Sequence, residues 1–149
     1  SAKSVDIPGE RTMRRKLCLT SDDVQKIVAA AKKHSAKIKR QPTIAVVDEA
    51  GHLLYLERPD VNGVNTVEMS TMKARTAALR GRPSAVFAKR VQERVGFLMA
   101  PNYLGVEGGI PLIFENECVS GVGVSGIDRD DETIAKAGAA GFAPPKSKK

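Results

Sequence analysis

The feature that most constrains the fold is a glycine-spaced stretch near the C-terminus, residues 119–126 with the sequence VSGVGVSG. A second apolar stretch, residues 108–114, precedes it, and the short polar linker between the two is typical of a β-hairpin. Gly121 and Gly123 are two positions apart, so they lie on the same face of their strand. Glycine inside a strand usually marks the close approach of another backbone, a helix or a ligand. We therefore expect a hollow on that face.

The length of 149 residues and the 42% hydrophobic content predict one globular domain. Residues 14–142 are expected to form it, after a polar arm over 1–13 and before a disordered basic tail over 143–149. No apolar run approaches the roughly 20 residues that span a bilayer, and the N-terminus has no apolar signal core. We expect a cytoplasmic protein without membrane contact, unless an export signal has been removed from the chain.

The net charge of +7 indicates either a solvated basic surface or attraction of an anionic small molecule. The lysines and arginines are spread along the chain, and no aromatic residues alternate with them as a base-stacking surface requires. Nucleic acid is therefore not an expected partner. Cys18 and Cys118 have no metal-ligand spacing, so we expect no metal site and interpret both as small buried hydrophobes.

The hydrophobic pattern alternates between helices and hairpins. Helices are predicted over residues 20–38 and 65–80, from Ser84 along an apolar stripe to Leu98, and from 131 to about 141. Hairpins are predicted over 43–57 and 108–126, and residues 15–19 have the pattern of a short edge strand. Hairpins separated by helices favour an α+β fold in which helices pack on an antiparallel sheet. Residues 121–126 spell the G-x-G-x-x-G dinucleotide-binding motif. That motif requires a strand that ends in a tight turn followed by a helix, whereas here the first two glycines fall inside a strand, so we expect no dinucleotide site.

Several segments, in the same order along the chain, resemble the GlcG/HbpS-like family of haem-binding or haem-degrading domains. They cover roughly residues 20–142 and are IAVVDEAGHL at 44–53, Arg58 with Asp60, KARTA at 73–77, GGIP at 108–111, GVGVSG at 121–126 and DETIA with AG at 131–138. The segment after Asp60 departs from the family pattern, because it is Val61-Asn62-Gly63 where the family usually has Gly-Ala.

The resemblance implies a profilin-like fold, with an antiparallel sheet of about five strands and flanking helices. It also implies assembly into homo-oligomers, often octamers, and it makes haem the implied cofactor. No haem-ligating residue carries over by motif. The only histidines, His34 and His52, are expected on the wet face of a helix and at an exposed turn.

The first functional hypothesis is a protein that binds haem or another anionic small molecule, as a sensor, carrier or accessory protein. Its pocket would be lined by the glycine-rich strands, Lys73 and the loop 101–109. The candidate ligand-binding residues are Arg58, Lys73, Arg75, Asn102, Tyr103, Gly108, Gly109, Ile110, Gly121 and Gly123. The plain alternative for Lys73 and Arg75 is that both extend to solvent.

The second hypothesis is an enzyme of a catabolic pathway that acts on a small organic acid. Glu107, beside Gly108 and Gly109, would be its general acid or base. Arg58, Lys73 or Arg75 would hold the carboxylate, and Tyr103 or Asn102 would assist. A third hypothesis is a ligand-free structural oligomer in which the glycines permit close subunit packing.

Overall fold

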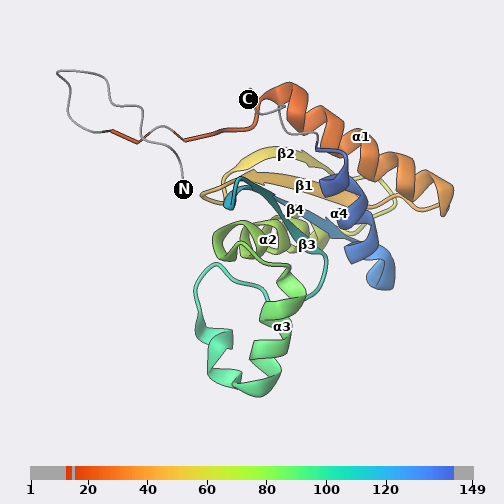
Figure 1. Cartoon of the computed structure of the whole chain (residues 1–149). Helices are drawn as coiled ribbons and strands as arrows, with labels where there is room; N and C mark the ends of the chain where they lie inside the picture. Colours follow the sequence, from red (N-terminus) through yellow and green to blue (C-terminus); the bar gives the residue numbers. More distant parts are fainter. Residues whose placement is uncertain (1–12, 15, 143–149) are drawn as a thin grey trace.

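The computed structural model describes residues 13, 14 and 16–142, which form an antiparallel sheet with helices on both faces (Figure 1). Helices α1 (Ser21–Lys37) and α4 (Asp131–Ala140) cover one face, and α2 (Asn65–Arg80) covers the other. None of the described helices is long and apolar enough to span a bilayer. Most of the expected N-terminal arm and the whole C-terminal tail lie outside the described residues.

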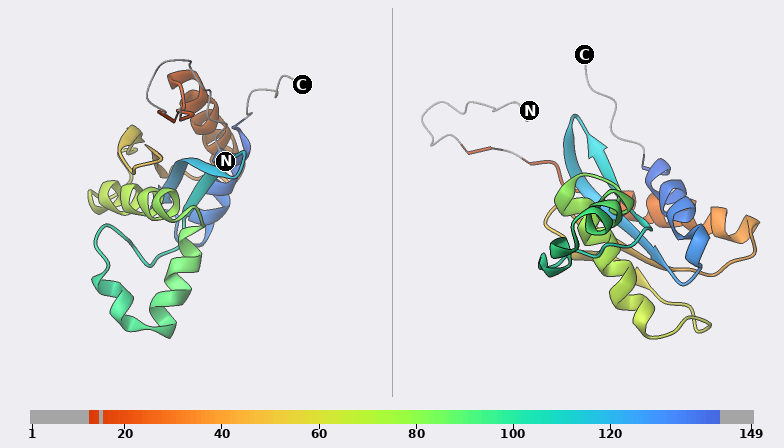
Figure 2. Two further views of the ribbon diagram at one scale, coloured as in Figure 1. Left: turned by 60° about the vertical axis from the view of Figure 1, so that its left-hand side comes forward. Right: turned by 90° about the horizontal axis from the view of Figure 1, so that it is seen from below.

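The sheet is built from two β-hairpins, as the sequence predicts. Its strand order is β2 (Leu53–Glu57), β1 (Thr43–Asp48), β4 (Glu117–Ser125) and β3 (Gly109–Phe114), and all neighbours are antiparallel (Figure 1). The right-hand view of Figure 2 shows the β3–β4 hairpin in cyan and blue. Gly51 turns the first hairpin with a φ of 85°, which favours glycine. Residues 16–20 are not in the sheet, so the expected edge strand is absent from the described residues and the sheet has four strands.

The larger apolar core lies between the sheet and the pair α1 and α4. Thr20 begins α1 in a capping box with Asp23, as the hydroxyl and acids there predict. Helix α1 then buries Val24, Ile27 and Val28, and α4 buries Ile134 and Ala135. These side chains pack against the sheet residues Ile44, Val46, Ile110, Leu112, Val119, Val122 and Val124.

On the other face, the backbone of α2 lies directly on the glycines of β3 and β4. A Cβ on Gly109, Gly121 or Gly123 would collide with the carbonyl oxygens of Lys73, Ala74 and Ser70 respectively. The hollow that we expected beside Gly121 and Gly123 is therefore filled by a helix of the same chain. These glycines allow α2 to pack closely on the sheet. On this face they therefore contact neither a ligand nor another subunit.

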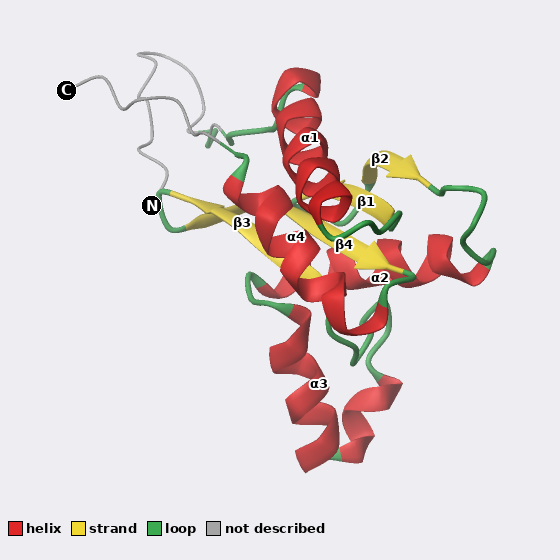
Figure 3. Ribbon diagram, turned by 90° about the vertical axis from the view of Figure 1, so that its right-hand side faces the viewer, coloured by secondary structure: helices red, strands yellow, loops and turns green. Residues whose placement is uncertain are grey.

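Helix α3 (Ser84–Glu93) is followed by the 3₁₀ segment η1 (Val95–Met99), and both project from the body of the molecule (Figure 3). The predicted stripe from Phe87 to Leu98 is wrong beyond Glu93, because Arg94 adopts an extended backbone with φ of −144° and ψ of 91°. Phe87 is buried, whereas Val95 and Leu98 are 71% and 62% exposed. The break therefore places apolar side chains in solvent.

The environment of the cysteines differs from our expectation. Cys18 is exposed in the segment before α1, and Cys118 in β4 is half-buried. Burial raises the pKa of the Cys118 thiol, which donates a hydrogen bond to the Ser120 carbonyl oxygen over 3.3 Å. His52 is exposed at the β1–β2 turn, as predicted, and its ring nitrogen lies 3.4 Å from Asp48.

Candidate functional site

An open cleft of about 520 Å³ lies beside α2 and α3, at the end of β4. Its volume falls within the roughly 300–1,000 Å³ typical of small-molecule sites. We name it the Lys73 cleft. It is lined by Asn65, Thr66, Met69, Lys73, Ala88, Gln92, Gly105, Val106, Glu107, Ser125, Gly126, Asp128, Arg129 and Asp131. The structure thus brings Lys73 and Glu107, two of the sequence-predicted site residues, to one cavity.

A buried ion pair between Lys73 and Asp131 forms one wall of the cleft. Lys73 Nζ donates to Asp131 Oδ2 over 2.8 Å and to the Val124 carbonyl oxygen over 3.0 Å. The two side chains are only 3% and 6% exposed. Lys73 therefore neither extends to solvent nor offers an unpaired charge to an anion, which corrects both interpretations of this residue from the sequence.

Asp131 occupies the first position of α4, where the helix dipole favours a negative charge. Its second carboxylate oxygen, Oδ1, accepts a hydrogen bond from the Ile127 backbone over 2.9 Å. Burial nevertheless raises the pKa of Asp131, and the hydrogen bond from Lys73 limits the rise. The side chains of Lys73 and Asp131 are fixed at this position by short contacts on several sides.

Gly108 makes room for this ion pair. It has a φ of 112°, and a Cβ there would lie 3.1 Å from both Lys73 Cδ and Asp131 Cβ. Its carbonyl oxygen accepts a hydrogen bond from Val124 over 2.9 Å. A side chain at position 108 would be both strained and crowded. Gly108, a sequence-predicted site residue, therefore does not line the cleft but leaves the space that the Lys73–Asp131 pair occupies.

The remaining charges of the cleft lie on exposed residues. Glu107 follows the loop from η1, and Asp128 and Arg129 belong to the short segment η2 (Asp128–Asp130) before α4. Arg129 makes no ion pair with any described residue. Because Asp131 neutralises Lys73, Arg129 is the cation that an incoming carboxylate would meet, and Glu107 and Asp128 would repel it.

The other sequence-predicted site residues do not line the Lys73 cleft. Arg75 lies beneath the β1–β2 turn, because a Cβ added to Gly51 would be 3.1 Å from Arg75 Cγ. Arg58 is exposed in the segment after β2. Tyr103 packs against Phe87 with ring centroids 5.4 Å apart, and Asn102 is exposed in the preceding turn. Ile110 belongs to the core beneath α1 and α4.

Three residues of the cleft were not predicted from the sequence, namely Asp131, Met69 and Arg129. We interpreted the acids at 128–132 only as a helix start, which explains their backbone contacts but not the burial of Asp131. One signal was available. A lysine on the alanine-lined, buried face of a predicted helix needs a carboxylate partner, and the acid cluster after the last strand is the nearest candidate in the predicted topology.

Comparisons with known proteins agree on one family. The family model described as "Haem degrading protein HbpS-like" matches residues 19–140. Protein GlcG of Escherichia coli (strain K12) is 36% identical over 114 residues, which cover 76% of this chain and 85% of GlcG.

Solved structures show the same fold. A double mutant of HbpS from Streptomyces reticuli is 30% identical, with a TM-score of 0.83 over 97% of this chain and 99% of that one. PduOC in its haem complex is 20% identical, with a TM-score of 0.75 over 84% of this chain and 95% of PduOC, a likeness of fold alone.

Proposed function

Because this chain belongs to the HbpS-like family, we propose that it binds haem or a related anionic cofactor, as a sensor, carrier or accessory protein. The family description names haem, and PduOC, which shares the fold, has been crystallised as a haem complex. The ligand would occupy the Lys73 cleft. The observation that carries this proposal is the meeting of α2, α3, the 105–107 loop and the β4–α4 connection around one cavity of ligand size.

The residues that line the Lys73 cleft fit such a cofactor in three respects. Met69, Ala88 and Val106 give it apolar surface, Met69 adds a thioether of the kind that ligates haem iron in some cytochromes, and Arg129 can pair with a propionate. When bound, haem supplies an iron centre for ligand binding or electron transfer. Met69 would hold the iron, and Arg129 would orient the macrocycle from the rim.

Hemin titration of the full chain tests this proposal. A saturable Soret band is expected, and Met69→Leu should shift or weaken it because leucine keeps the volume but lacks the sulfur. Met72→Leu is the matched control, since Met72 lies on the same helix, is also half-buried and does not line the cleft. A flat, non-saturating response of the wild type, or equal spectra for both variants, would count against haem in this cleft.

A second candidate function is an enzyme in which Glu107 acts as general acid or base on a small organic acid. The exposed carboxylate of Glu107 lines the same cavity as the buried Lys73–Asp131 pair, where a substrate could reach it. Glu107→Gln would then abolish turnover of a substrate found by screening. Unchanged turnover in that variant would exclude this role.

We also propose that the protein assembles into a homo-oligomer, up to an octamer. Edge strand β2 exposes Leu53, Leu54 and Leu56, and η1 exposes Val95, Leu98 and Met99. A second copy would remove this apolar surface from water. Sedimentation of the full chain measures the subunit number. A Leu54→Glu variant should shift it towards smaller species, and a monomeric wild type would contradict the proposal.

A further inference from the structure

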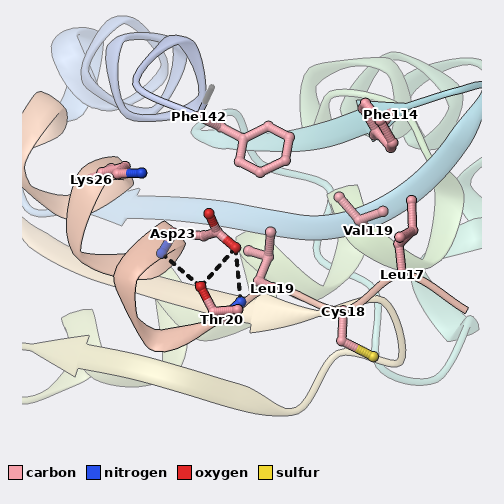
Figure 4. A pocket seen from close by; sticks show the side chains of 9 residues that line it. All are labelled: Leu17, Cys18, Leu19, Thr20, Asp23, Lys26, Phe114, Val119 and Phe142. Carbon is pink, nitrogen blue, oxygen red and sulfur yellow. Dashed lines mark hydrogen bonds between the residues drawn. The ribbon is translucent and has the colours of Figure 1, made fainter. Parts of the chain in front are cut away.

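A second cavity, of about 390 Å³, opens on the side of the sheet covered by α1 and α4 (Figure 4). We name it the Phe142 pocket. It is lined by Leu17, Cys18, Leu19, Thr20, Asp23, Lys26, Phe114, Val119 and Phe142. It shares no lining residue with the Lys73 cleft. Any ligand of this pocket would therefore be independent of the proposed haem site.

The Phe142 pocket has an apolar wall and a polar end. In Figure 4 the lining runs from Lys26 and Asp23, past Phe142 and Leu19, to the group that contains Val119. Leu19, Phe114 and Phe142 are only partly buried, although they pack against the apolar core. A ligand that covered them would remove more apolar surface from water, which favours a hydrocarbon chain.

At the polar end of the pocket, Thr20 and Asp23 form hydrogen bonds with each other. Asp23 Oδ2 accepts bonds from the Thr20 backbone and hydroxyl, each over 2.9 Å, and Thr20 Oγ1 accepts from the Asp23 backbone over 3.2 Å. Lys26 forms no hydrogen bond or ion pair with a described residue, but its charge adds to the Thr20 hydrogen bonds in lowering the pKa of the nearby Asp23 carboxyl. Its ammonium group therefore keeps its hydrogen-bonding capacity for a ligand carboxylate, which must compete with Asp23 for the charge.

The opposite end of the pocket is less suited to an anion. A neighbouring depression shares Leu17 and Val119 with it and carries Glu49 and Glu117 together with Arg14 and Lys16. Lys16 lies 3.8 Å from Glu49, so acids there already compete for the cations. A carboxylate would consequently be placed at Lys26, with its chain directed along the apolar wall.

We propose that the Phe142 pocket binds an aliphatic carboxylate, whose chain covers Leu19, Val119 and Phe142 and whose head group pairs with Lys26. Decanoate is a suitable probe, and decanol is the matched probe without the charge. Calorimetric titration of the full chain with decanoate, below the concentration at which it forms micelles, should give saturable binding of one molecule per chain. Decanol should bind more weakly, because it forms no ion pair.

Two charge-reversal variants test whether decanoate binds through an ion pair with Lys26 or only through the net positive charge of the protein. Lys26→Glu replaces the attraction of an exposed cation by a repulsion, so it should weaken decanoate binding several-fold and leave decanol binding unchanged. Lys33→Glu is the control, because Lys33 is exposed on the same helix, does not line the pocket and undergoes the same charge change. It should leave decanoate affinity at the wild-type value.

The apolar wall is tested by Phe142→Ala, which should weaken decanoate and decanol together. Circular dichroism verifies that each variant is folded. The proposal is overturned if decanoate shows no saturable binding to the wild type. It is equally overturned if Lys26→Glu and Lys33→Glu reduce the affinity to the same extent, since decanoate would then respond only to net charge.

Discussion

The carbonyl oxygen of Ser70 on α2 occupies the place that a Cβ of Gly123 on β4 would take. Gly123 is paired with Ala45 on one side and Gly109 on the other, so small residues cross three strands beneath the helix. Gly123→Ala would push α2 away from the sheet. We expect a loss of about 1–3 kcal/mol in the free energy of unfolding, as for other overpacked cores, measured by urea denaturation.

Gly96→Ala is the matched control for that substitution. Gly96 lies in η1, and a Cβ there would meet no atom within 4 Å. Alanine should therefore leave the stability unchanged or raise it slightly, because it restricts the unfolded chain. Equal stabilities for the Gly96 and Gly123 variants would show that α2 does not need bare backbone beneath it.

The buried ion pair gives a second prediction. Lys73→Met or Asp131→Asn alone leaves one charge buried without its partner, which typically costs about 3–5 kcal/mol of stability. The double variant removes both charges and should lose clearly less than the sum of the single losses. Urea denaturation of the four proteins measures the coupling. Additive losses would mean that the 2.8 Å contact between Lys73 and Asp131 contributes no coupling energy.

The same pair predicts a pH dependence. Burial raises the pKa of Asp131, and Lys73 opposes that rise, so Lys73→Met should raise this pKa further. Between the unfolded and native pKa values the native state then holds more protons than the unfolded state, and stability increases as the pH falls. The stability deficit of Lys73→Met relative to the wild type should therefore shrink from pH 7 towards pH 5. A deficit that grows over this range would contradict the assignment.

Most of the fold follows from local pattern. The capping residues before α1 and the alternation in the 43–57 hairpin each have one physical interpretation, and the structure has both elements. The end of α3 at Glu93 could not be predicted. The apolar spacing continues through Val95 and Leu98, whereas the backbone at Arg94 is extended and ends the helix. There the protein exposes apolar side chains, which a pattern based on burial cannot anticipate.

The candidate site was less predictable than the fold. The sequence singled out Gly121 and Gly123, but glycine spacing alone does not distinguish a helix from a ligand as the approaching group. The structure identifies the helix. Lys73 and Glu107 reach one cavity because α2 and the 105–107 loop meet beside the end of β4, and this proximity depends on the packing of elements far apart in the chain.

The two cysteines should differ in reactivity towards a thiol reagent. Cys18 is exposed, whereas Cys118 is half-buried, with its pKa raised by burial and its thiol donating to Ser120. Since the thiolate is the reactive form, Ellman's reagent should label one thiol rapidly and the other slowly. Cys18→Ser should remove the fast phase and Cys118→Ser the slow one. Loss of the fast phase from Cys118→Ser instead would reverse the assignment.

Glu107 distinguishes the two functional candidates for the Lys73 cleft. If the cleft binds an anionic cofactor at Arg129, the Glu107 carboxylate on the same rim opposes it, and Glu107→Gln should tighten hemin binding. Exposed charges contribute about 0.2–1 kcal/mol, so we expect a gain of roughly 1.4-fold to fivefold at low ionic strength. The gain should largely disappear near 1 M salt, where the Debye length is about 3 Å.

Glu115→Gln makes the same charge change in the distant β3–β4 turn and should leave hemin affinity unaltered. If both variants tighten hemin equally, the effect reflects net charge and the cleft is not the site. If Glu107→Gln instead weakens hemin, Glu107 contacts the ligand directly. Because a general acid or base must exchange a proton with its substrate, an enzyme would lose turnover in this variant, whereas a binding protein would gain affinity.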